Sequence, residues 1–257
     1  PALGPAEGRM TTTILATEEI SVAYGKFLAL SEVSVSFERN TLTAIIGPNG
    51  AGKSTFFNAI SGALRPNFGR VMFEGRDITG SPQHAFARMG IAKSFQITNV
   101  FPRLSTHENV RVAVQMRRAR FDLFTPRESL GELTDKADQL LATVGLTDAR
   151  RRPAADLAHG QQRCLEIALA LACDPKLLLL DEPTAGMSPE ETVAMMDLIV
   201  MLAGQRTVIL VEHKMKLVMG ICQRVIVLHH GEFLAEGSPE EVRANAEVKR
   251  VYLGQGV

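Results

Sequence analysis

A glycine-rich octapeptide between two apolar segments restricts the fold of this chain more than any other feature. Residues 47–54 read Gly-Pro-Asn-Gly-Ala-Gly-Lys-Ser, with the apolar run 42–46 before them and a helix-compatible segment, 54–64, after them. Glycines let the backbone N–H groups of such a loop converge on one point, and the N-terminus of a following helix adds partial positive charge there. The pattern therefore predicts a strand, a phosphate-binding loop and a helix in succession.

Individual positions of this loop have expected roles. The ammonium group of Lys53 would reach the β- and γ-phosphates of a nucleotide, and the hydroxyl group of Ser54 would bind Mg²⁺. A glycine-rich turn that binds nothing is the alternative, but it does not require the complete pattern between a strand and a helix. The predicted nucleotide-binding residues of the loop are Gly47, Pro48, Asn49, Gly50, Ala51, Gly52, Lys53, Ser54 and Thr55.

A second motif places two acidic residues after a buried strand. Residues 177–180 are four leucines, and Asp181 and Glu182 follow directly. A parallel strand would carry Asp181 to the edge of the sheet at which the phosphate-binding loop also opens. We expect Asp181 to hold Mg²⁺ through a water molecule and Glu182 to accept a proton from the water that attacks the nucleotide. An exposed acidic turn explains this motif alone, but not its occurrence together with the loop.

The remaining patterns predict an α/β core that is interrupted by helices. Alternating apolar residues at 20–24 and 33–37 indicate two half-buried antiparallel strands. Short apolar runs at 208–211 and 225–228 are typical of a parallel sheet that is covered on both faces. Residues 99–156 are rich in Arg, Ala and Leu, which favours helices. Capping-box spacing predicts helix starts at Ser105 with Glu108, Thr125 with Glu128, Ser188 with Glu191, and Ser238 with Glu241.

The composition argues against several classes of protein. Lys and Arg together number 28, as do Asp and Glu, so the chain lacks the basic excess that a nucleic-acid partner usually requires. No segment reaches the roughly 20 apolar residues that cross a bilayer, so any membrane role is expected to depend on a partner. Cys164, Cys173 and Cys222 share no metal-ligand spacing and are expected to be reduced, buried thiols. Residues 1–12 lack the apolar core of a signal peptide and are expected to form a flexible leader.

Further landmarks resemble those of the ATP-binding-cassette (ABC) proteins, and the resemblance extends from residue 15 to residue 254. Residues 157–161 read Leu-Ala-His-Gly-Gln and are similar to the family signature, which is usually Leu-Ser-Gly-Gly-Gln. Tyr24 lies upstream of the phosphate-binding loop, where the family has an aromatic residue that stacks on adenine. Gln96 matches the family's glutamine between the core and the helical subdomain, and His213 matches its switch histidine.

The resemblance implies a fold in which the core contains an insertion. The expected core is an α/β P-loop NTPase core of the RecA-like type, accompanied by an antiparallel β subdomain. An α-helical subdomain is expected to be inserted at approximately residues 97–163. Residues 13–257 would then form a single ABC ATPase domain.

The resemblance also implies how the chain hydrolyses ATP. Glu182 would be the catalytic carboxylate, and His213 would bind the γ-phosphate and orient Glu182 and the attacking water. Gln96 would contact Mg²⁺ or this water and sense the γ-phosphate. The implied Mg²⁺ ligands are therefore Ser54, Gln96 and Asp181.

The signature has an implied role outside its own nucleotide site. It consists of Leu157, Ala158, His159, Gly160 and Gln161. In the family, the helix that starts here caps the γ-phosphate of the ATP bound to a partner cassette, so ATP joins two cassettes head to tail. Ala158 replaces the signature serine, and the lost charge-assisted hydrogen bond would cost about 1.5–3 kcal/mol. His159 replaces a glycine and is a candidate replacement donor. Residues 185–188 also lack the terminal aspartate that is usual in this loop of the family. Together with Ala158, this leaves open how fast a homodimer would hydrolyse ATP.

Other stretches resemble the ATPase subunits of importers for branched-chain amino acids and their relatives for urea and short amides. These stretches are residues 90–96, 100–110, 162–168 and 237–254. The resemblance implies an ATP- and Mg²⁺-dependent importer subunit that pairs with a second cassette, identical or different, and with two transmembrane permease subunits. A periplasmic solute-binding protein would take part indirectly. The chain would lie at the cytoplasmic face of the inner membrane, attached through the permeases.

Three questions stay open at the level of sequence. Phe95, Phe101 and Leu104 are candidates for the apolar groove that holds a permease helix in this family, but they fit the core of the helical insert equally well. A non-transport ABC ATPase is one alternative function, although no coiled-coil insertion is visible. A catalytically weak, nucleotide-dependent assembly module is the other, suggested by Ala158 and Ser188.

Overall fold

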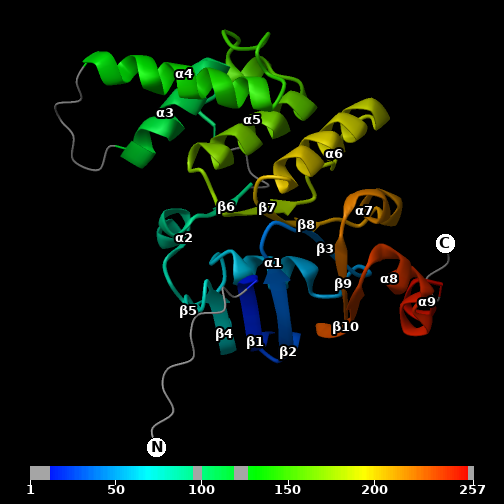
Figure 1. Ribbon diagram of the computed structural model, residues 1–257. Coiled ribbons are helices and arrows are strands. Elements are labelled where there is room, and N and C mark those ends of the chain that lie inside the picture. The colour runs from blue at the N-terminus through cyan, green and yellow to red at the C-terminus, as the bar shows by residue number, and fades with distance from the viewer. Residues whose placement is uncertain (1–11, 95–99, 119–126, 254–257) are drawn as a thin grey trace, which may run out of the picture.

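The computed structural model describes residues 12–94, 100–118 and 127–253 (Figure 1). In Figure 1 the antiparallel strands lie at the bottom, the mainly parallel strands in the middle, and the helices from the middle of the chain at the top. Apart from Thr12, the predicted leader at 1–12 lies outside the described residues, as do Phe95 and Gln96. None of the helices within these three ranges is long and apolar enough to cross a membrane.

The first sheet is antiparallel and has the order β2-β1-β4-β5. Its strands are β1 (Thr13–Tyr24), β2 (Phe27–Glu38), β4 (Phe68–Phe73) and β5 (Arg76–Asp77). Ile20 pairs with Val33 across β1 and β2, which confirms the two antiparallel strands that the alternating apolar pattern predicts. The side chains of Ile20 and Phe37 are completely buried, so one face of this sheet belongs to the core.

The second sheet has six strands in the order β10-β9-β3-β8-β7-β6. Its strands are β3 (Leu42–Ile46), β6 (Ile91–Lys93), β7 (Leu177–Asp181), β8 (Thr207–Val211), β9 (Arg224–His229) and β10 (Glu232–Gly237). Neighbouring strands are parallel, except that β10 runs antiparallel to β9. Every residue of β3, β7 and β8 is buried, which confirms the expected α/β core with a sheet covered on both faces.

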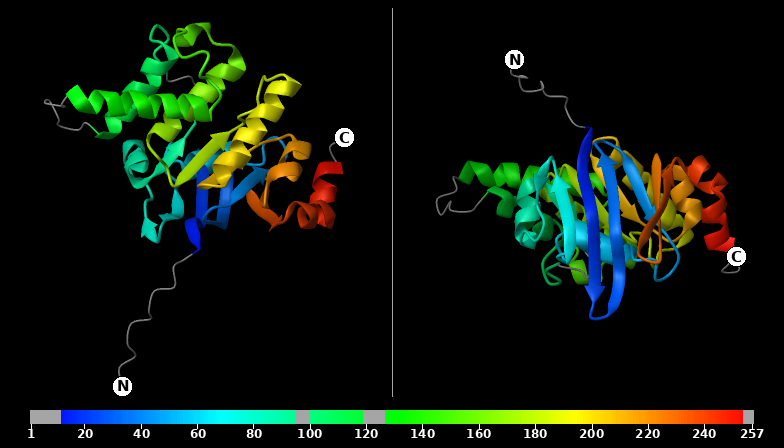
Figure 2. Two further views of the ribbon diagram at one scale, coloured as in Figure 1. Left: turned by 45° about the horizontal axis from the view of Figure 1, so that its top comes forward. Right: turned by 90° about the horizontal axis from the view of Figure 1, so that it is seen from below.

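The two faces of this sheet belong to different hydrophobic clusters. Leu178 and Leu180 of β7 pack in the cluster that includes the helices of the middle of the chain. Leu177 and Leu179 pack on the other face, with α1 (Lys53–Ile60) and the antiparallel sheet. Because side chains alternate along a strand, one run of leucines contributes to both clusters. The sheet therefore lies between a helical layer and a layer of α1 and antiparallel strands (Figure 2).

The helices occur mostly where the sequence predicts them. Those after α1 are α2 (Gln83–Met89), α3 (Thr106–Arg118), α4 (Arg127–Thr143), α5 (His159–Ala172), α6 (Pro189–Ala203), α7 (Met215–Ile221), α8 (Pro239–Ala244) and α9 (Ala246–Leu253), with a 3₁₀ turn at Ala154–Asp156. The helix expected at 54–64 is shorter, because α1 ends at Ile60 and Gly62 adopts a φ of 72°. The expected insert at 97–163 covers α3, α4 and the start of α5, and its boundaries stay a prediction.

Three of the four predicted capping boxes are present. The hydroxyl groups of Ser105, Ser188 and Ser238 accept hydrogen bonds, at 3.1, 3.2 and 3.2 Å, from the backbone N–H three residues later. In each box the glutamate at that later position accepts a hydrogen bond from the N–H of the serine. Thr125, which belongs to the fourth box, lies outside the described residues, and α4 begins at Arg127.

Candidate active site

The loop predicted to bind phosphate connects β3 to α1 and packs closely against two other segments. A β-carbon on Gly47 would lie 2.3 Å from the carbonyl oxygen of Leu228, and one on Gly52 would lie 2.8 Å from that of Ala29. Gly52 also has a φ of 91°, which a residue with a side chain rarely adopts. Glycine is therefore required at both positions, and contacts with β2 and β9 fix the shape of the loop.

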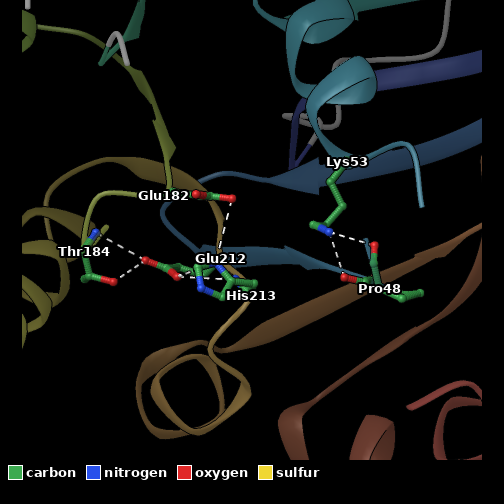
Figure 3. A network of polar contacts seen from close by, with 7 residues as sticks. Pro48, Lys53, Glu182, Thr184, Glu212 and His213 are labelled. Carbon is green, nitrogen blue, oxygen red and sulfur yellow. Dashed lines mark hydrogen bonds and ion pairs between the residues drawn. The ribbon is translucent and has the colours of Figure 1, made fainter. Parts of the chain in front are cut away.

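Lys53 is the first residue of α1, and only 8% of its surface is exposed. Its Nζ donates hydrogen bonds to the carbonyl oxygens of Gly47, at 2.8 Å, and of Pro48, at 2.9 Å (Figure 3). Burial lowers the pKa of Lys53, and the nearby carboxylates of Glu182 and Asp181 oppose this shift. The ammonium group thus lies within the loop, where phosphate oxygens can replace the two carbonyl acceptors.

The other predicted residues of the loop differ in their exposure. Pro48 and Ala51 are buried, whereas Asn49 and Gly50 are exposed at its tip. Ser54 is exposed in the first turn of α1, and Thr55 beside it is half-buried. The hydroxyl group of Ser54 is therefore accessible to an ion that binds next to the loop.

Asp181 and Glu182 lie at the end of β7 in different environments. Asp181 is buried, which raises the pKa of its carboxyl group, and the charge of Lys93 opposes this increase. Glu182 has a φ of 45°, in the left-handed region, and its N–H donates to the carbonyl oxygen of Val211 at 2.9 Å. The side chain of Glu182 is 35% exposed, so water has access to its carboxylate. The two acids are therefore adjacent in sequence but can perform different tasks.

His213 follows β8 and lies beside Glu182 (Figure 3). Its Nδ1 is 3.7 Å from Oε1 of Glu182, and its side chain is 50% exposed. The two residues come together because β7 and β8 are parallel neighbours, with Asp181 paired to Val211. The structure thus brings together Lys53, Asp181, Glu182 and His213, as expected from the sequence, and their catalytic roles stay predictions.

Glu212 is a buried polar residue at this site that the sequence analysis did not identify. It lies directly after β8 and is completely buried. Its Oε1 accepts hydrogen bonds from Thr184, from Oγ1 at 2.5 Å and from the backbone N–H at 3.3 Å (Figure 3). The only signal in the sequence is an acidic residue after an apolar strand, the same signal that identified Asp181 after β7.

Tyr24, the predicted adenine-stacking residue, ends β1 with an exposed side chain. It pairs with Phe27 across the turn into β2, and Phe27 and Leu28 are exposed as well. Ala29, the next residue of β2, contacts the phosphate-binding loop at Gly52. Tyr24 and Phe27 therefore form an accessible aromatic surface on the same hairpin that contacts the loop through Ala29. Stacking of Tyr24 on a base stays a prediction.

The signature occupies the start of α5. The helix begins at His159, close to the predicted start at Gly160, and Ala158 is its N-cap residue. Ala158 has no side-chain oxygen with which to cap the helix, although Oε1 of Gln161 accepts a hydrogen bond from the N–H of Ala158 at 3.2 Å. Leu157 before it is buried. The first turn of α5 therefore retains N–H groups that can bind an anion.

The signature packs against another part of its own chain. A β-carbon on Gly186 would lie 3.2 Å from Cε1 of His159, and one on Gly160 would lie 2.5 Å from Oε1 of Glu191. These contacts connect the start of α5 to residues 185–188 and to α6. Across residues 12–94, 100–118 and 127–253, no hydrogen bond joins the signature to the phosphate-binding loop. Gln96, the remaining predicted site residue, lies outside the described residues.

Comparisons with known proteins agree with this arrangement. Residues 30–185 match the family described as ABC transporter, and residues 234–257 match the family described as branched-chain amino acid ATP-binding cassette transporter. The chain is 39% identical to the high-affinity branched-chain amino acid transport ATP-binding protein LivG of Salmonella typhimurium, over 96% of this chain and 100% of LivG.

Solved structures of similar proteins have the same fold. The ADP conformation of MJ1267, an ATP-binding cassette of an ABC transporter, superposes with a TM-score of 0.83 at 30% identity, over 95% of this chain and 100% of MJ1267. A dimeric post-hydrolysis state of the cassette MJ0796, bound to ADP and Pi, has a TM-score of 0.75 at 26% identity, over 88% of this chain and 99% of MJ0796. Together with the family matches, these similarities show that the chain belongs to the ABC transporter family and is an ATP-hydrolysing cassette of that family.

Proposed function

We propose that this chain energises an importer for branched-chain amino acids or a related small solute. The observation that carries the proposal is the convergence of Lys53, Asp181, Glu182 and His213 at the carboxyl edge of the parallel sheet. The similarity to LivG and the family match at residues 234–257 support the class of solute. The solute itself would bind to partner proteins and not to this chain.

The residues of the site have distinct tasks in ATP hydrolysis. Lys53 would exchange the carbonyl oxygens of Gly47 and Pro48 for phosphate oxygens, which keeps its buried charge compensated. Glu182 would take the proton of the attacking water, because its carboxylate is accessible and near His213. His213 would hold Glu182 in place and hydrogen-bond the γ-phosphate. Tyr24 would stack on the adenine ring.

The oxygen atoms near the loop suit Mg²⁺. Ser54 offers an accessible hydroxyl group, and Asp181 offers a carboxylate at the end of β7, which β8 separates from β3 in the sheet. Mg²⁺ usually takes only one or two protein ligands beside phosphates and waters, so this donor set fits. When bound with ATP, Mg²⁺ would neutralise the charge that develops on the phosphates. Gln96 is proposed as a further ligand on the resemblance alone.

We also propose that the signature completes the nucleotide site of a second cassette. The uncapped first turn of α5 presents free N–H groups and the positive end of a helix dipole, which suit a γ-phosphate. His159 is accessible at this turn, so it is placed to donate where Ala158 has no hydroxyl group. The similarity to a dimeric cassette bound to ADP and Pi supports a pair of cassettes, and the head-to-tail arrangement rests on the resemblance. The partner is either a second copy or a different cassette.

An apolar cavity suits the proposed permease contact. The cavity has a volume of about 270 Å³ and lies where α2, β6, α3 and α5 meet. Its lining includes Phe86, Lys93, Phe101, Met116, Glu166 and Leu169. Phe101 is exposed and lines this cavity. Leu104, the other candidate among the described residues, does not line it. A permease helix bound in this cavity would attach the chain to the cytoplasmic face of the inner membrane.

One observation favours a second candidate function, a catalytically weak assembly module. The methyl group of Ala158 stands where an anion-binding hydroxyl group is usual, which would slow hydrolysis across the dimer interface. Steady-state phosphate release by the chain, with and without the two permease subunits, separates the two functions. An importer ATPase hydrolyses ATP and is stimulated by the permeases. An assembly module binds ATP without comparable turnover, whether the permeases are present or absent.

Lys53→Ala provides the sharpest test of the nucleotide site. Loss of the ammonium group removes the main positive side chain of the loop, so we expect ATP affinity to fall by about a hundredfold or more. This change corresponds to ~3 kcal/mol, the contribution of a hydrogen bond to a charged group. Equilibrium binding of a fluorescent ATP analogue measures this change. Lys249→Ala, which alters an exposed lysine on α9, outside the loop and the strand ends that carry Glu182 and His213, serves as the control. An unchanged affinity in Lys53→Ala would refute the assignment of the phosphate-binding loop.

A further inference from the structure

Glu212 is a completely buried carboxylate to which the proposed mechanism assigns no task. It continues the chain directly after β8, whose five residues are also buried. A carboxylate in such a position costs free energy unless hydrogen bonds or opposite charges compensate it, and an apolar side chain would avoid that cost. The contacts of Glu212 therefore indicate what the carboxylate does.

Both carboxylate oxygens of Glu212 accept hydrogen bonds, and the donors belong to two different segments. Oε1 accepts from Oγ1 of Thr184 at 2.5 Å and from the N–H of Thr184 at 3.3 Å. Oε2 accepts from the N–H of His213 at 3.3 Å, and Nδ1 of His213 lies 3.9 Å away. Thr184 is completely buried as well. The side chain of Glu212 thus connects the segment after β7 to the segment after β8 (Figure 3).

These two segments carry the groups that act on ATP in the proposed mechanism. Thr184 lies two residues after Glu182, and its carbonyl oxygen accepts a hydrogen bond from the N–H of Met187 at 3.3 Å. His213 lies 3.7 Å from Glu182 on the accessible side of the same strand ends. The segments after β7 and β8 are therefore connected twice. Glu212 and Thr184 form the buried contact, and His213 and Glu182 form the accessible one.

We propose that Glu212 is a positioning residue for ATP hydrolysis. Through Thr184 it holds Glu182 and the loop 185–188 at a fixed distance from His213. Glu212 touches neither the nucleotide nor the attacking water, and it acts only through Thr184 and His213. A γ-phosphate that moves His213 would consequently move the loop 185–188, which packs against the signature at His159. The inference rests on the proposed function, because that function gives Glu182 and His213 their tasks.

Two substitutions weaken the buried connection with little change in volume, although the backbone N–H of residue 184 and one acceptor oxygen at position 212 are kept. Thr184→Val deletes the hydroxyl donor, and Glu212→Gln places an amide NH₂ where one carboxylate oxygen accepted a hydrogen bond. We expect each variant to lower kcat for ATP hydrolysis by about tenfold or more, because small displacements of catalytic groups have large effects on rate. The Kd for a fluorescent ATP analogue is expected to change by less than about threefold, since the phosphate-binding loop is intact. The double variant should lose about as much as the more impaired single variant.

Thr17→Val is a matched control for the loss of a buried hydroxyl group. Oγ1 of Thr17 donates to the carbonyl oxygen of Val33 at 3.0 Å and accepts from the N–H of Val35 at 3.1 Å, within the antiparallel sheet. We expect this variant to keep the wild-type kcat per folded molecule. Hydrogen–deuterium exchange of residues 182–188, measured without nucleotide, gives an independent readout. Exchange there should be faster in Thr184→Val and Glu212→Gln than in the wild type or in Thr17→Val.

The outcomes separate the inference from the function on which it rests. Wild-type kcat together with wild-type exchange at 182–188 in both variants would overturn the positioning role of Glu212. A loss of kcat no larger than that of Thr17→Val would also overturn it, because the role would then be purely structural. A wild-type chain that hydrolyses no ATP, even with its permeases, contradicts the proposed function instead. In that case the exchange measurement still decides whether Glu212 fixes the loop 185–188.

Discussion

At the scale of single residues, Asp181 and Glu182 are neighbours with separable roles, and substitution of Glu182 tests this separation. Glu182→Gln keeps the size of the side chain but removes the proton acceptor. We expect nucleotide affinity to stay unchanged and turnover to fall by about 10²–10⁴-fold, the usual contribution of a general base. Phosphate release and nucleotide binding, measured on the same preparation, report the two quantities.

The control for this substitution is Glu240→Gln, which changes an exposed glutamate in the first turn of α8. It should leave both affinity and turnover unchanged. If Glu182 is the proton acceptor, Glu182→Gln should also accumulate as ATP-bound dimers in size-exclusion chromatography, because ATP that is not hydrolysed continues to join the cassettes. Wild-type turnover in this variant would remove Glu182 from its proposed role.

The site residues that the sequence predicts are those with a local signal. Lys53 belongs to a loop whose spacing is diagnostic, and Asp181 follows four leucines. Glu212 follows an apolar strand in the same way, but its burial depends on a hydrogen bond to Thr184, which lies 28 residues earlier in the chain. The exposure of Phe27 beside Tyr24 is likewise not a local property, since it depends on the hairpin between β1 and β2. Contacts between distant segments cannot be read from one local pattern.

At the scale of elements, the start of α5 differs from those of α6 and α8 in lacking a side-chain cap. Ala158→Ser would supply the missing hydroxyl group, which can accept the N–H of Gln161 and complete a capping box with that glutamine. We expect the free energy of unfolding to increase by about 1 kcal/mol, the usual contribution of an N-cap. Urea denaturation followed by circular dichroism measures the change.

Ser188→Ala is the matched control in the opposite direction. It removes an existing cap, since Oγ of Ser188 accepts the N–H of Glu191 at 3.2 Å, and should lower the free energy of unfolding by a similar amount, about 1 kcal/mol. If Ala158→Ser leaves stability unchanged while Ser188→Ala lowers it, the first turn of α5 does not lack a cap in the wild type. Increased ATP turnover in Ala158→Ser would further support the proposed role of the signature.

The elements that the sequence predicts are those determined within a few residues. The capping boxes at Ser105, Ser188 and Ser238 are local, and all three are present. The edge strands β6 and β10 were not predicted, because β6 has only three residues and β10 is largely exposed, so neither forms a distinct apolar run. Their membership of the sheet depends on pairing with β7 and β9, which no short segment encodes.

At the scale of the whole molecule, one glutamate connects the two sheets. Glu74, in the turn between β4 and β5, accepts from Arg39 at 2.9 Å and from Lys176 at 2.8 Å. Arg39 lies between β2 and β3, and Lys176 directly precedes β7. Ion pairs at the ends of their strands therefore join the antiparallel and parallel sheets, in addition to the hydrophobic cluster between them. Loss of this connection should affect the stability of the fold without changing the nucleotide site.

Glu74→Gln tests this connection through its dependence on pH. The hydrogen bond from Lys176, with help from Arg39, lowers the pKa of Glu74 below its ordinary value of 4.5. A lowered pKa in the folded state adds stability above pH 4.5, and this contribution disappears as the pH falls through the folded-state pKa. Because Arg39 and Lys176 are 39% and 55% exposed, water screens both ion pairs, and we expect Glu74→Gln to lower the free energy of unfolding by only about 0.5–1 kcal/mol at pH 7.

Urea denaturation of wild type and variant between pH 7 and pH 4 measures this difference in stability. It should shrink toward acid, and added salt should reduce it at pH 7. Glu247→Gln, at an exposed position on α9, should show no such dependence, and a Glu74→Gln difference that grows toward acid would contradict the assigned ion pairs.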